Sequence, residues 1–257
     1  MGFNRMLLVI DIGNTSISIG LYEDNRLEKK SWINHGHNLN EEELANAIKP
    51  FIPQECVISS VADELTDRVR NFVINTYNVN PVLINSCVKS GITTKVKHPE
   101  TIGADRLANI YAAAKLYSAR PLIVVDSGSA TTFDVLDKEG DFIGGVIMPG
   151  FGIQSESLHA YTSKLPLINV KDVKTTVSVI QDETGDEMIS GVIRGHVCSV
   201  EGLVRECEKE LAAKPYVILT GGNMHILQQY MQKDLYNEAN PNLTLEGIRM
   251  LYKSSKI

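Results

Sequence analysis

The sequence predicts an α/β protein that contains two copies of one structural unit. Strand-like runs alternate with helical patterns along the 257 residues. The segment that begins at Leu7 can be laid over the segment that begins at Leu122 without a gap, so that Asp11 falls on Asp126 and Leu21 on Leu136. A long helical pattern follows the second copy. We expect an N-terminal half over residues 1–118 and a C-terminal half over residues 119–257, the latter with a dimerisation helix.

Composition and charge favour a folded protein of enzyme size and argue against some partners. The hydrophobic share of 43% and the charged share of 22% are ordinary for a globular chain. The net charge is −6, and Lys and Arg are scattered along the sequence. Nucleic-acid surfaces gather positive charge on one face, so we expect no nucleic-acid partner.

No segment has the pattern of a membrane span or a secretion signal. The apolar run over residues 6–10 is only a strand's length, and Asp11 interrupts it. The four cysteines have wide and unrelated spacings, which indicates neither a zinc site nor a disulfide framework. We therefore expect a cytoplasmic protein that does not bind membranes.

The first half begins with a meander of strands. Residues 7–22 predict a strand, a tight Gly-Asn turn and a second strand, and a polar turn leads to a third strand. Asn40 is typical of a helix N-cap, because three glutamates follow it in the first turn. Strand-like runs over residues 57–61 and 82–84 flank a further predicted helix.

The second half repeats the meander and then becomes helical. Apolar residues recur at helical spacing over residues 186–211. Gly191, Gly195 and Gly202 would each cost this helix roughly 1 kcal/mol relative to Ala. We therefore expect a close backbone approach there, as at a subunit interface. A strand, a glycine turn and two helices, the last from near Leu243, complete the chain.

The repeated meanders carry acidic turns that suit phosphate groups. Asp11-Ile12-Gly13-Asn14-Thr15 ends a buried strand, where successive amide dipoles can hold an anion and Asp11 can hold Mg²⁺ directly or through water. The second copy, from Asp126 to Asp134, adds hydroxyl groups at Ser129, Thr131 and Thr132. Each turn alone could be an ordinary Asp-Gly hairpin. Two copies could face each other across one nucleotide.

A third motif places an acid and a base at the expected start of a helix. In Thr101-Ile102-Gly103-Ala104-Asp105-Arg106, Asp105 could accept the proton of a substrate hydroxyl that attacks the γ-phosphate. Arg106 could bind a substrate carboxylate or the charge of the transferred group. The alternative is a first-turn Asp that stabilises the helix dipole beside a solvated Arg.

The remaining motifs are less specific. Thr220-Gly221-Gly222-Asn223 lies between a strand and a helix, where adenine or ribose could lie against bare backbone. The six histidines, His35 and His37 among them, lack a metal-binding pattern and favour surface or packing roles. No G-x-x-x-x-G-K-[ST] sequence occurs, which argues against a P-loop kinase.

Together these motifs resemble the ordered signature of the type III pantothenate kinases. The segments that carry the resemblance are residues 11–15, 58–61, 103–106, 126–134, 144–150, 164–166, 220–222 and 243–247. The resemblance implies the duplicated actin-like fold of the acetate kinase, sugar kinase, Hsp70 and actin superfamily. In that fold, two ribonuclease H-like halves each contain a mixed sheet flanked by helices.

The resemblance also implies the reaction and its participants. ATP phosphorylates pantothenate to 4′-phosphopantothenate in the first step of coenzyme A biosynthesis, with Mg²⁺ and a monovalent cation, K⁺ or NH₄⁺. The enzyme is expected to be a homodimer with its active site near the interface.

Roles carry over to this chain residue by residue. Asp105 is the catalytic proton acceptor, and Gly103, Ala104 and Arg106 line the pantothenate site, which Thr184 contacts from the other subunit. Asp126 binds the monovalent cation, and Asp11 is also the candidate for magnesium. The residues that would contact ATP are Asp11, Ile12, Gly13, Asn14, Thr15, Ser16, Ile17, Ser18 and Ser129.

Three departures from the family pattern affect the expected substrate sites. Val96 and Lys97 lie near the position of a usual substrate-contacting tyrosine. Ser129 replaces a threonine and keeps its hydroxyl. Gln181-Asp182-Glu183 places acids before Thr184, where the family has a cation, beside an anionic substrate.

Two alternatives stay open, one because of the departures at Val96 and at residues 181–183, and one because shared phosphate turns do not specify the acceptor. The chain could be a catalytically weak ATP-binding regulatory relative, or a kinase of the same fold for another small hydroxylated substrate. The intact residues Asp11, Asp105, Arg106 and Asp126 favour the kinase, and the motif around Asp105 favours pantothenate as the acceptor.

Overall fold

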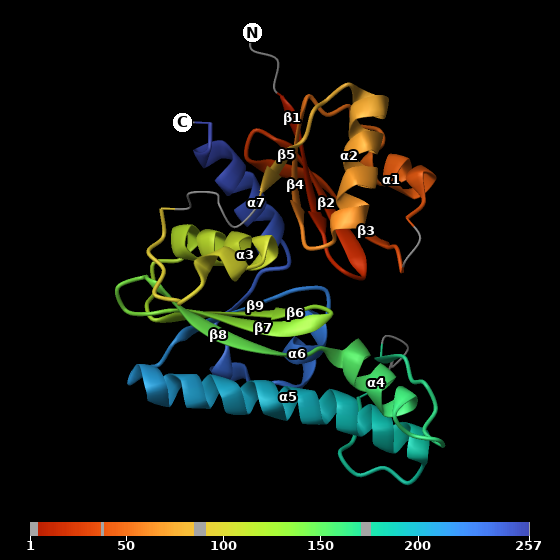
Figure 1. Cartoon of the computed structure of the whole chain (residues 1–257). Coiled ribbons are helices and arrows are strands. Elements are labelled where there is room, and N and C mark those ends of the chain that lie inside the picture. Colours follow the sequence, from red (N-terminus) through yellow and green to blue (C-terminus); the bar gives the residue numbers. More distant parts are fainter. Residues whose placement is uncertain (1–4, 37–38, 85–90, 171–175, 257) are drawn as a thin grey trace. The chain divides into compact units, whose positions relative to one another are not determined.

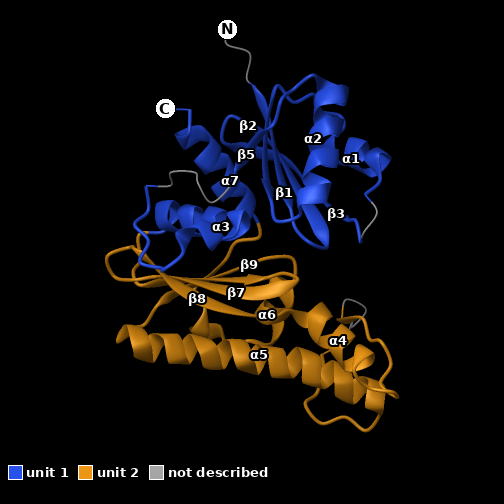
Figure 2. Cartoon of the chain, in the orientation of Figure 1, with its two compact units in different colours: residues 1–117, 242–257 blue, residues 118–241 orange. Residues whose placement is uncertain are grey.

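The computed structural model describes residues 5–36, 39–84, 91–170 and 176–256. The chain forms two compact units (Figure 2): unit 1 contains Met1–Tyr117 and Asn242–Ile257, and unit 2 contains Ser118–Pro241. The first boundary lies next to the expected one. The last helix differs from the expected division, because its apolar side chains pack in the core of unit 1.

Unit 1 is a five-stranded mixed sheet with helices on both faces (Figure 1). The strand order is β3-β2-β1-β4-β5, and β1 pairs antiparallel with β2 and parallel with β4. Its strands are β1 (Met6–Ile12), β2 (Ser16–Glu23), β3 (Arg26–Asn34), β4 (Glu55–Ser60) and β5 (Val82–Ile84). Its helices are α1 (Glu41–Ile48), α2 (Asp63–Tyr77), the short 3₁₀ turn η1 (Pro99–Thr101), α3 (Ala104–Leu116) and α7 (Leu243–Ser254).

The alternation of apolar side chains along β1 builds a core on each face of this sheet. Leu8 and Ile10 pack with α1 and α2, whereas Leu7 and Val9 pack with α3 and α7. The predicted N-cap of α1 is confirmed, because the side chain of Asn40 accepts a hydrogen bond of 2.9 Å from the Glu42 amide.

Helices α3 and α7 are in close backbone contact. A Cβ atom at Gly247 would lie 2.0 Å from the Ala108 carbonyl oxygen and 2.5 Å from its carbonyl carbon. Thr244 donates a hydrogen bond of 2.8 Å to the fully buried amide oxygen of Asn109. Since Asp105 lies in the first turn of α3, this contact with α7 helps to hold the Asp105 helix against the sheet.

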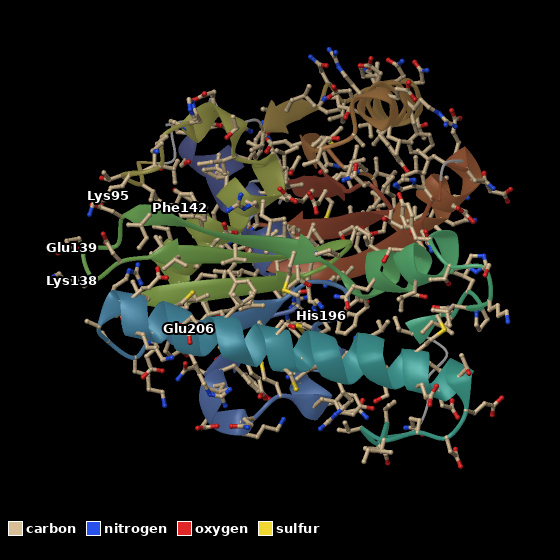
Figure 3. All side chains as sticks on the ribbon, turned by 60° about the horizontal axis from the view of Figure 1, so that its bottom comes forward. Lys95, Lys138, Glu139, Phe142, His196 and Glu206 are labelled. Atoms are coloured by element: carbon tan, nitrogen blue, oxygen red, sulfur yellow. The ribbon has the colours of Figure 1, made fainter. Side chains whose placement is uncertain are left out.

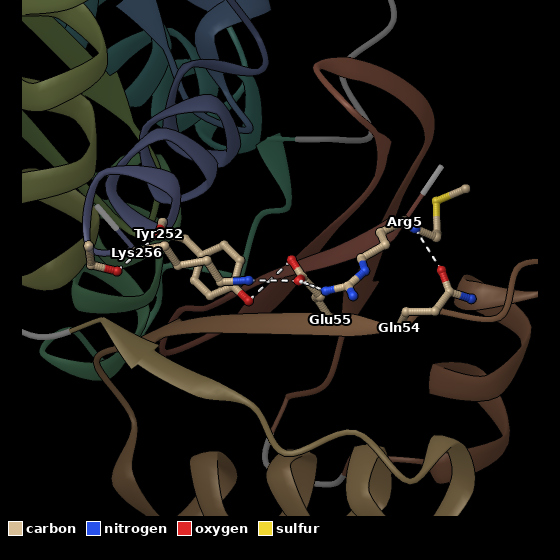
Figure 4. A network of polar contacts seen from close by, with 7 residues as sticks. Arg5, Gln54, Glu55, Tyr252 and Lys256 are labelled. Carbon is tan, nitrogen blue, oxygen red and sulfur yellow. Dashed lines mark hydrogen bonds and ion pairs between the residues drawn. The ribbon is translucent and has the colours of Figure 1, made fainter. Parts of the chain in front are cut away.

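A polar network ties the two ends of unit 1 together (Figure 4). Glu55 Oε1 lies 2.7 Å from the Lys256 ammonium and 3.3 Å from the Arg5 guanidinium, and the Tyr252 hydroxyl donates to Glu55 Oε2. Burial alone would raise the pKa of the Glu55 carboxyl. The hydrogen bonds and positive charges of Lys256 and Arg5, with the Tyr252 bond, outweigh burial and lower that pKa.

Unit 2 repeats the sheet of unit 1. Its strand order, β8-β7-β6-β9-β10, places β6 antiparallel to β7 and parallel to β9, as in the first sheet. The long helix α5 runs along one face of the sheet (Figure 1), and the unit's hydrophobic core lies between them. Its strands are β6 (Leu122–Ser127), β7 (Ala130–Leu136), β8 (Phe142–Pro149), β9 (Tyr216–Thr220) and β10 (Glu238–Ala239). Its helices are α4 (Phe151–Ala160), α5 (Thr184–Leu211), α6 (Met224–Tyr230) and the 3₁₀ turn η3 (Lys233–Leu235).

The predicted repeat is confirmed, but the gapless overlay is wrong beyond the turn. In the first hairpin, Ile12 pairs with Ile17 and encloses residues 13–16. In the second, Ser127 pairs with Thr131 and encloses residues 128–130, one residue fewer. The match of Asp11 with Asp126 therefore holds, whereas the structural counterpart of Leu136 is Tyr22 rather than Leu21.

Candidate active site

The first acidic turn lies where β1 ends. The Asp11 carboxylate accepts a hydrogen bond of 3.0 Å from the Ser59 hydroxyl on the adjacent parallel strand. Asn14 and Thr15 are exposed at the tip of the turn. Ile12 and Ile17 are fully buried in the hydrophobic core, so only their backbone could meet a nucleotide.

His35 holds this turn from the end of β3. Its ring is buried, and Nε2 lies 3.1 Å from the Gly13 carbonyl oxygen, while its backbone amide donates to the Thr15 carbonyl. A carbonyl oxygen only accepts, so Nε2 carries the proton. The expected packing role of His35 thus includes two hydrogen bonds to the turn. His37 lies outside the described residues.

The second acidic turn has three successive carbonyl groups bonded within unit 2. The backbone amide of Asn223 donates to the Ser127 carbonyl at 2.8 Å, and its side-chain Nδ2 donates to the Gly128 carbonyl at 3.2 Å. The Gly150 amide donates to the Ser129 carbonyl at 3.0 Å. The carbonyl groups of residues 127–129 are therefore bonded by two separate parts of the chain, Asn223 and Gly150.

Asp126 occupies the position of Asp11 in the second sheet, with Thr220 beside it on the parallel strand. Gly221 approaches it closely: a Cβ atom at Gly221, whose φ is +90°, would lie 2.3 Å from Asp126 Oδ1. Only glycine adopts this φ readily and leaves that space. The same Cβ atom would lie 2.6 Å from the Ser127 carbonyl oxygen, so a carboxylate oxygen and a carbonyl oxygen both lie close to Gly221, and oxygen atoms are the ligands that hard cations prefer.

A partly buried hydrogen-bond chain supports the start of β7. Gln154 Nε2 donates to the Pro149 carbonyl at 2.9 Å and lies 2.6 Å from His196 Nδ1, and His196 Nε2 lies 3.0 Å from the Thr131 hydroxyl. Because the Gln154 amide also faces a carbonyl, its nitrogen is the donor and His196 Nδ1 must accept. Figure 3 shows His196 on the side of α5 that faces the sheet.

We predict that the buried imidazole of His196 makes folding stability depend on pH. Burial lowers the pKa of its imidazole to about 4, against an ordinary value of 6.5 in the unfolded chain. Below pH 6.5 the histidine binds a proton in the unfolded state and stays neutral in the folded state. The contribution of the neutral His196 to folding stability is therefore complete above pH 6.5 and is lost as the pH falls to 4. The expected loss in the free energy of unfolding is roughly 3 kcal/mol.

Urea unfolding of the natural sequence and of His196→Leu at several pH values between 4 and 7 measures this loss. Carboxylates titrate in both proteins, so the difference between their free energies of unfolding isolates the histidine. That difference should shrink from pH 7 to pH 4. A constant difference would show that His196 does not titrate in this range.

The helix-start motif has the geometry that the sequence predicts. Gly103 is the N-cap of α3, and Asp105 lies in its first turn, partly exposed. Asp105 Oδ1 accepts a hydrogen bond of 2.8 Å from the Arg106 amide. A Cβ atom at Gly103 would lie 2.5 Å from the same oxygen, so glycine leaves room for this carboxylate. The Asp105 carboxylate therefore lies in the first turn of the helix, where it suits the helix dipole, and is also partly exposed.

The predicted site residues divide between the two units. Asp11, its turn and the motif at Asp105 belong to unit 1, where β1 and α3 pack in a common core. Asp126, Ser129 and Thr184 belong to unit 2, and Thr184 is exposed as the first residue of α5.

Sequence reasoning did not assign Ser59, His35 or Asn223 to the turns they hold.

Within the described ranges, no group of three or more His, Cys, Asp or Glu side chains is arranged to bind a metal ion. Nor does the described part of the chain contain a helix of the length and hydropathy needed to cross a bilayer.

Two of the most similar curated proteins are both described as type III pantothenate kinases. The protein from Listeria monocytogenes serovar 1/2a is 32% identical over 98% of this chain and 98% of its own length. The protein from Roseiflexus sp. strain RS-1 is 36% identical over 98% of this chain and 100% of its own length.

Solved structures show the fold. A putative Baf family transcriptional activator from Campylobacter jejuni superposes with a TM-score of 0.61 at 19% identity, over 97% of this chain and 98% of that one. MreB 5 of Spiroplasma citri, solved with AMPPNP, gives a TM-score of 0.52 at 11% identity, over 99% and 98% of the two chains. The expected duplicated actin-like fold is confirmed.

The sequence model of one family extends over most of the chain. The model of the type III pantothenate kinases matches residues 7–206, which include both acidic turns and the motif at Asp105. With the two curated relatives over nearly the full length, this match shows that the chain belongs to the type III pantothenate kinase family.

Proposed function

We propose that this chain transfers the γ-phosphoryl group of ATP to the primary hydroxyl of pantothenate, the first step of coenzyme A biosynthesis. The observation that carries the proposal is the repeated acidic turn: Asp11 and Asp126 are the next-to-last residues of equivalent strands in sheets of identical order. Membership of the family supports the choice of reaction and substrate.

Each functional group has a role in this reaction. Asp105 takes the proton from the attacking hydroxyl, and Arg106 binds the pantothenate carboxylate together with Gly103 and Ala104. The backbone of the two turns and the Ser129 hydroxyl bind the phosphates of ATP. Because phosphoryl transfer needs little covalent participation from the protein, positioning and charge stabilisation supply most of the rate.

The acidic side chains fit the cations of the reaction. Asp11 is the candidate for Mg²⁺, and the Ser59 bond to Oδ1 fixes the orientation of its carboxylate. Asp126, with Gly221 close against it, is the candidate for K⁺ or NH₄⁺. When bound, these ions neutralise negative charge on the phosphates.

A coupled assay of ADP formation tests the proposal. The purified protein is supplied with ATP and Mg²⁺ and then with pantothenate or a panel of sugars, each with and without K⁺ or NH₄⁺. Saturable activity with pantothenate alone, stimulated by a monovalent cation, is expected. Equal activity with a sugar would favour the alternative kinase, and ATP binding without turnover would favour the regulatory relative.

We also infer that the enzyme is a cytoplasmic homodimer in which α5 lies at the interface. A Cβ atom built at Gly191, Gly195 or Gly202 would meet no atom of the described residues within 4 Å outside the backbone of its own helix, so no described contact within the chain explains these helix-weakening residues. Thr184 begins the same helix and would contact pantothenate bound to the other subunit.

Gly195→Arg is expected to separate the subunits without unfolding them. The new side chain has open space in a single chain, but it would clash or bury a charge at a packed helix interface. Sedimentation equilibrium should show a dimer for the natural sequence and a monomer for the variant, with an unchanged circular dichroism spectrum. An unshifted dimer would exclude this part of α5 from the interface.

A further inference from the structure

In each acidic turn, two backbone carbonyl groups accept hydrogen bonds from a single residue elsewhere in the same unit. In unit 1, the His35 amide binds the Thr15 carbonyl at 3.3 Å and its Nε2 binds the Gly13 carbonyl at 3.1 Å. In unit 2, the Asn223 amide binds the Ser127 carbonyl at 2.8 Å and its Nδ2 binds the Gly128 carbonyl at 3.2 Å. Both side chains thus donate to the carbonyl of the turn glycine.

These two donors do not come from equivalent positions of the repeat. His35 directly follows β3, whereas Asn223 lies between β9 and α6. Gly13 and Gly128, by contrast, are equivalent, since each is the first residue enclosed by its hairpin. The same carbonyl is therefore held in both halves by unrelated parts of the unit. This indicates that the orientation of the glycine carbonyl matters to both turns.

A hydrogen bond that fixes the direction of the glycine carbonyl also fixes the direction of the N–H group of the next residue. In a trans peptide, the carbonyl of one residue and the N–H of the next point in opposite directions. A donor bound to the Gly13 carbonyl therefore turns the Asn14 N–H away from His35, and a donor bound to the Gly128 carbonyl turns the Ser129 N–H away from Asn223. Asn14 and Ser129 are both exposed.

We propose that His35 and Asn223 are positioning residues that orient the Asn14 and Ser129 amides toward the phosphates of ATP. The proposal rests on the proposed function, in which these turns bind the nucleotide. Oriented amide dipoles bind anions with little reorganisation, so loss of either donor should weaken ATP binding and leave the pantothenate site intact.

The His35 ring is not optimised for stability. Its Nδ1 is buried without a hydrogen-bond partner in the described structure, and such an atom costs free energy that an apolar side chain would not. Replacing the ring by an apolar chain should therefore change folding stability little. If His35 had only a structural role, the same replacement would instead mainly lower the free energy of unfolding.

The test compares variants that differ in the donor. His35→Gln keeps an N–H near the position of Nε2, whereas His35→Met has a similar length and no donor. Asn223→Leu removes the side-chain donor while it keeps the branched shape of the side chain and the backbone bond to Ser127. His225→Met, at an exposed histidine of α6, is the matched control.

Steady-state kinetics should show an increase of about 5- to 10-fold in the KM for ATP for His35→Met and for Asn223→Leu, as expected for one lost hydrogen bond. The KM for pantothenate and the melting temperature should change little. His35→Gln should fall close to the natural sequence, and His225→Met should match it. Equal rises in both KM values, or an unchanged KM for ATP, would overturn the proposal.

A second readout does not need the reaction. The NMR order parameters of the Asn14 and Ser129 N–H groups, measured in the protein without nucleotide, should be lower in the variant that lacks the corresponding donor. If the natural sequence failed to phosphorylate pantothenate, the proposed function would fail, while the order parameters would still test whether His35 and Asn223 fix these amides. Unchanged order parameters in both donor-free variants would contradict the proposal directly.

Discussion

Asp105→Asn lowers the turnover of pantothenate by about 10²- to 10⁴-fold, the usual contribution of a positioned general base. The amide keeps the shape of the carboxylate and its Oδ1 can still accept the Arg106 N–H, but it cannot take the proton of the attacking hydroxyl. Binding of ATP should be nearly unchanged. Single-turnover ADP formation and calorimetric titration with a non-hydrolysable ATP analogue measure the two effects separately.

The matched control is Asp63→Asn, which changes an acid in the first turn of α2. Loss of a first-turn carboxylate should cost either helix about 0.3 to 1 kcal/mol through its dipole. If Asp105 only served its helix, both variants would show this small loss of stability and normal turnover. Full pantothenate-dependent activity in Asp105→Asn would remove the proposed base.

Gly247→Ala is expected to destabilise unit 1 by about 3 kcal/mol or more. The new methyl group would lie 2.0 Å from the Ala108 carbonyl oxygen and 2.9 Å from its Cα, so α7 must move away from the backbone of α3. This movement would also separate Thr244 from the buried Asn109. Activity should fall with the folded fraction, since α3 carries Asp105.

Gly152→Ala supplies the control for this substitution. Gly152 also lies in a helix, α4, but a Cβ atom there would meet no described atom within 4 Å outside the backbone of that helix. This variant should be neutral or more stable by up to about 1 kcal/mol, because alanine restricts the unfolded chain. Chemical denaturation followed by circular dichroism compares the two. Equal stability of both variants would show that the close contact at Gly247 can relax.

Most of the fold could be predicted because its signals are local. The meander, the N-cap at Asn40 and the long helix α5 each follow from periodicity and capping residues near in sequence. Helix α4 was not predicted, since its segment buries only Phe151 and Ser155 and has no apolar stripe.

Two errors arose from information that the sequence pattern does not contain. The one-residue difference between the hairpins was invisible, because hydroxyl and small residues around Ser129 align equally well in either register. The place of α7 in unit 1 depends on its packing against α3 and β1 rather than on its position in the chain.

Some residues of the candidate site could likewise be predicted from the sequence, and others could not. The acidic turns and the Asp105 motif could be found as contiguous segments. His35 and Asn223 could not, because each bonds a carbonyl 22 or 95 residues away along the chain, and backbone carbonyls leave no signature in side-chain sequence. A donor side chain beside a glycine turn, such as Asn223 after Gly221-Gly222, was the one available signal.

A crystal structure with β,γ-imido ATP, Mg²⁺ and pantothenate tests the account most directly. We predict that the turns of Asp11 and Asp126 both contact one triphosphate, and that the Asp105 carboxylate lies within hydrogen-bonding distance of the pantothenate primary hydroxyl. A nucleotide bound by only one turn, or a hydroxyl out of reach of Asp105, would contradict it.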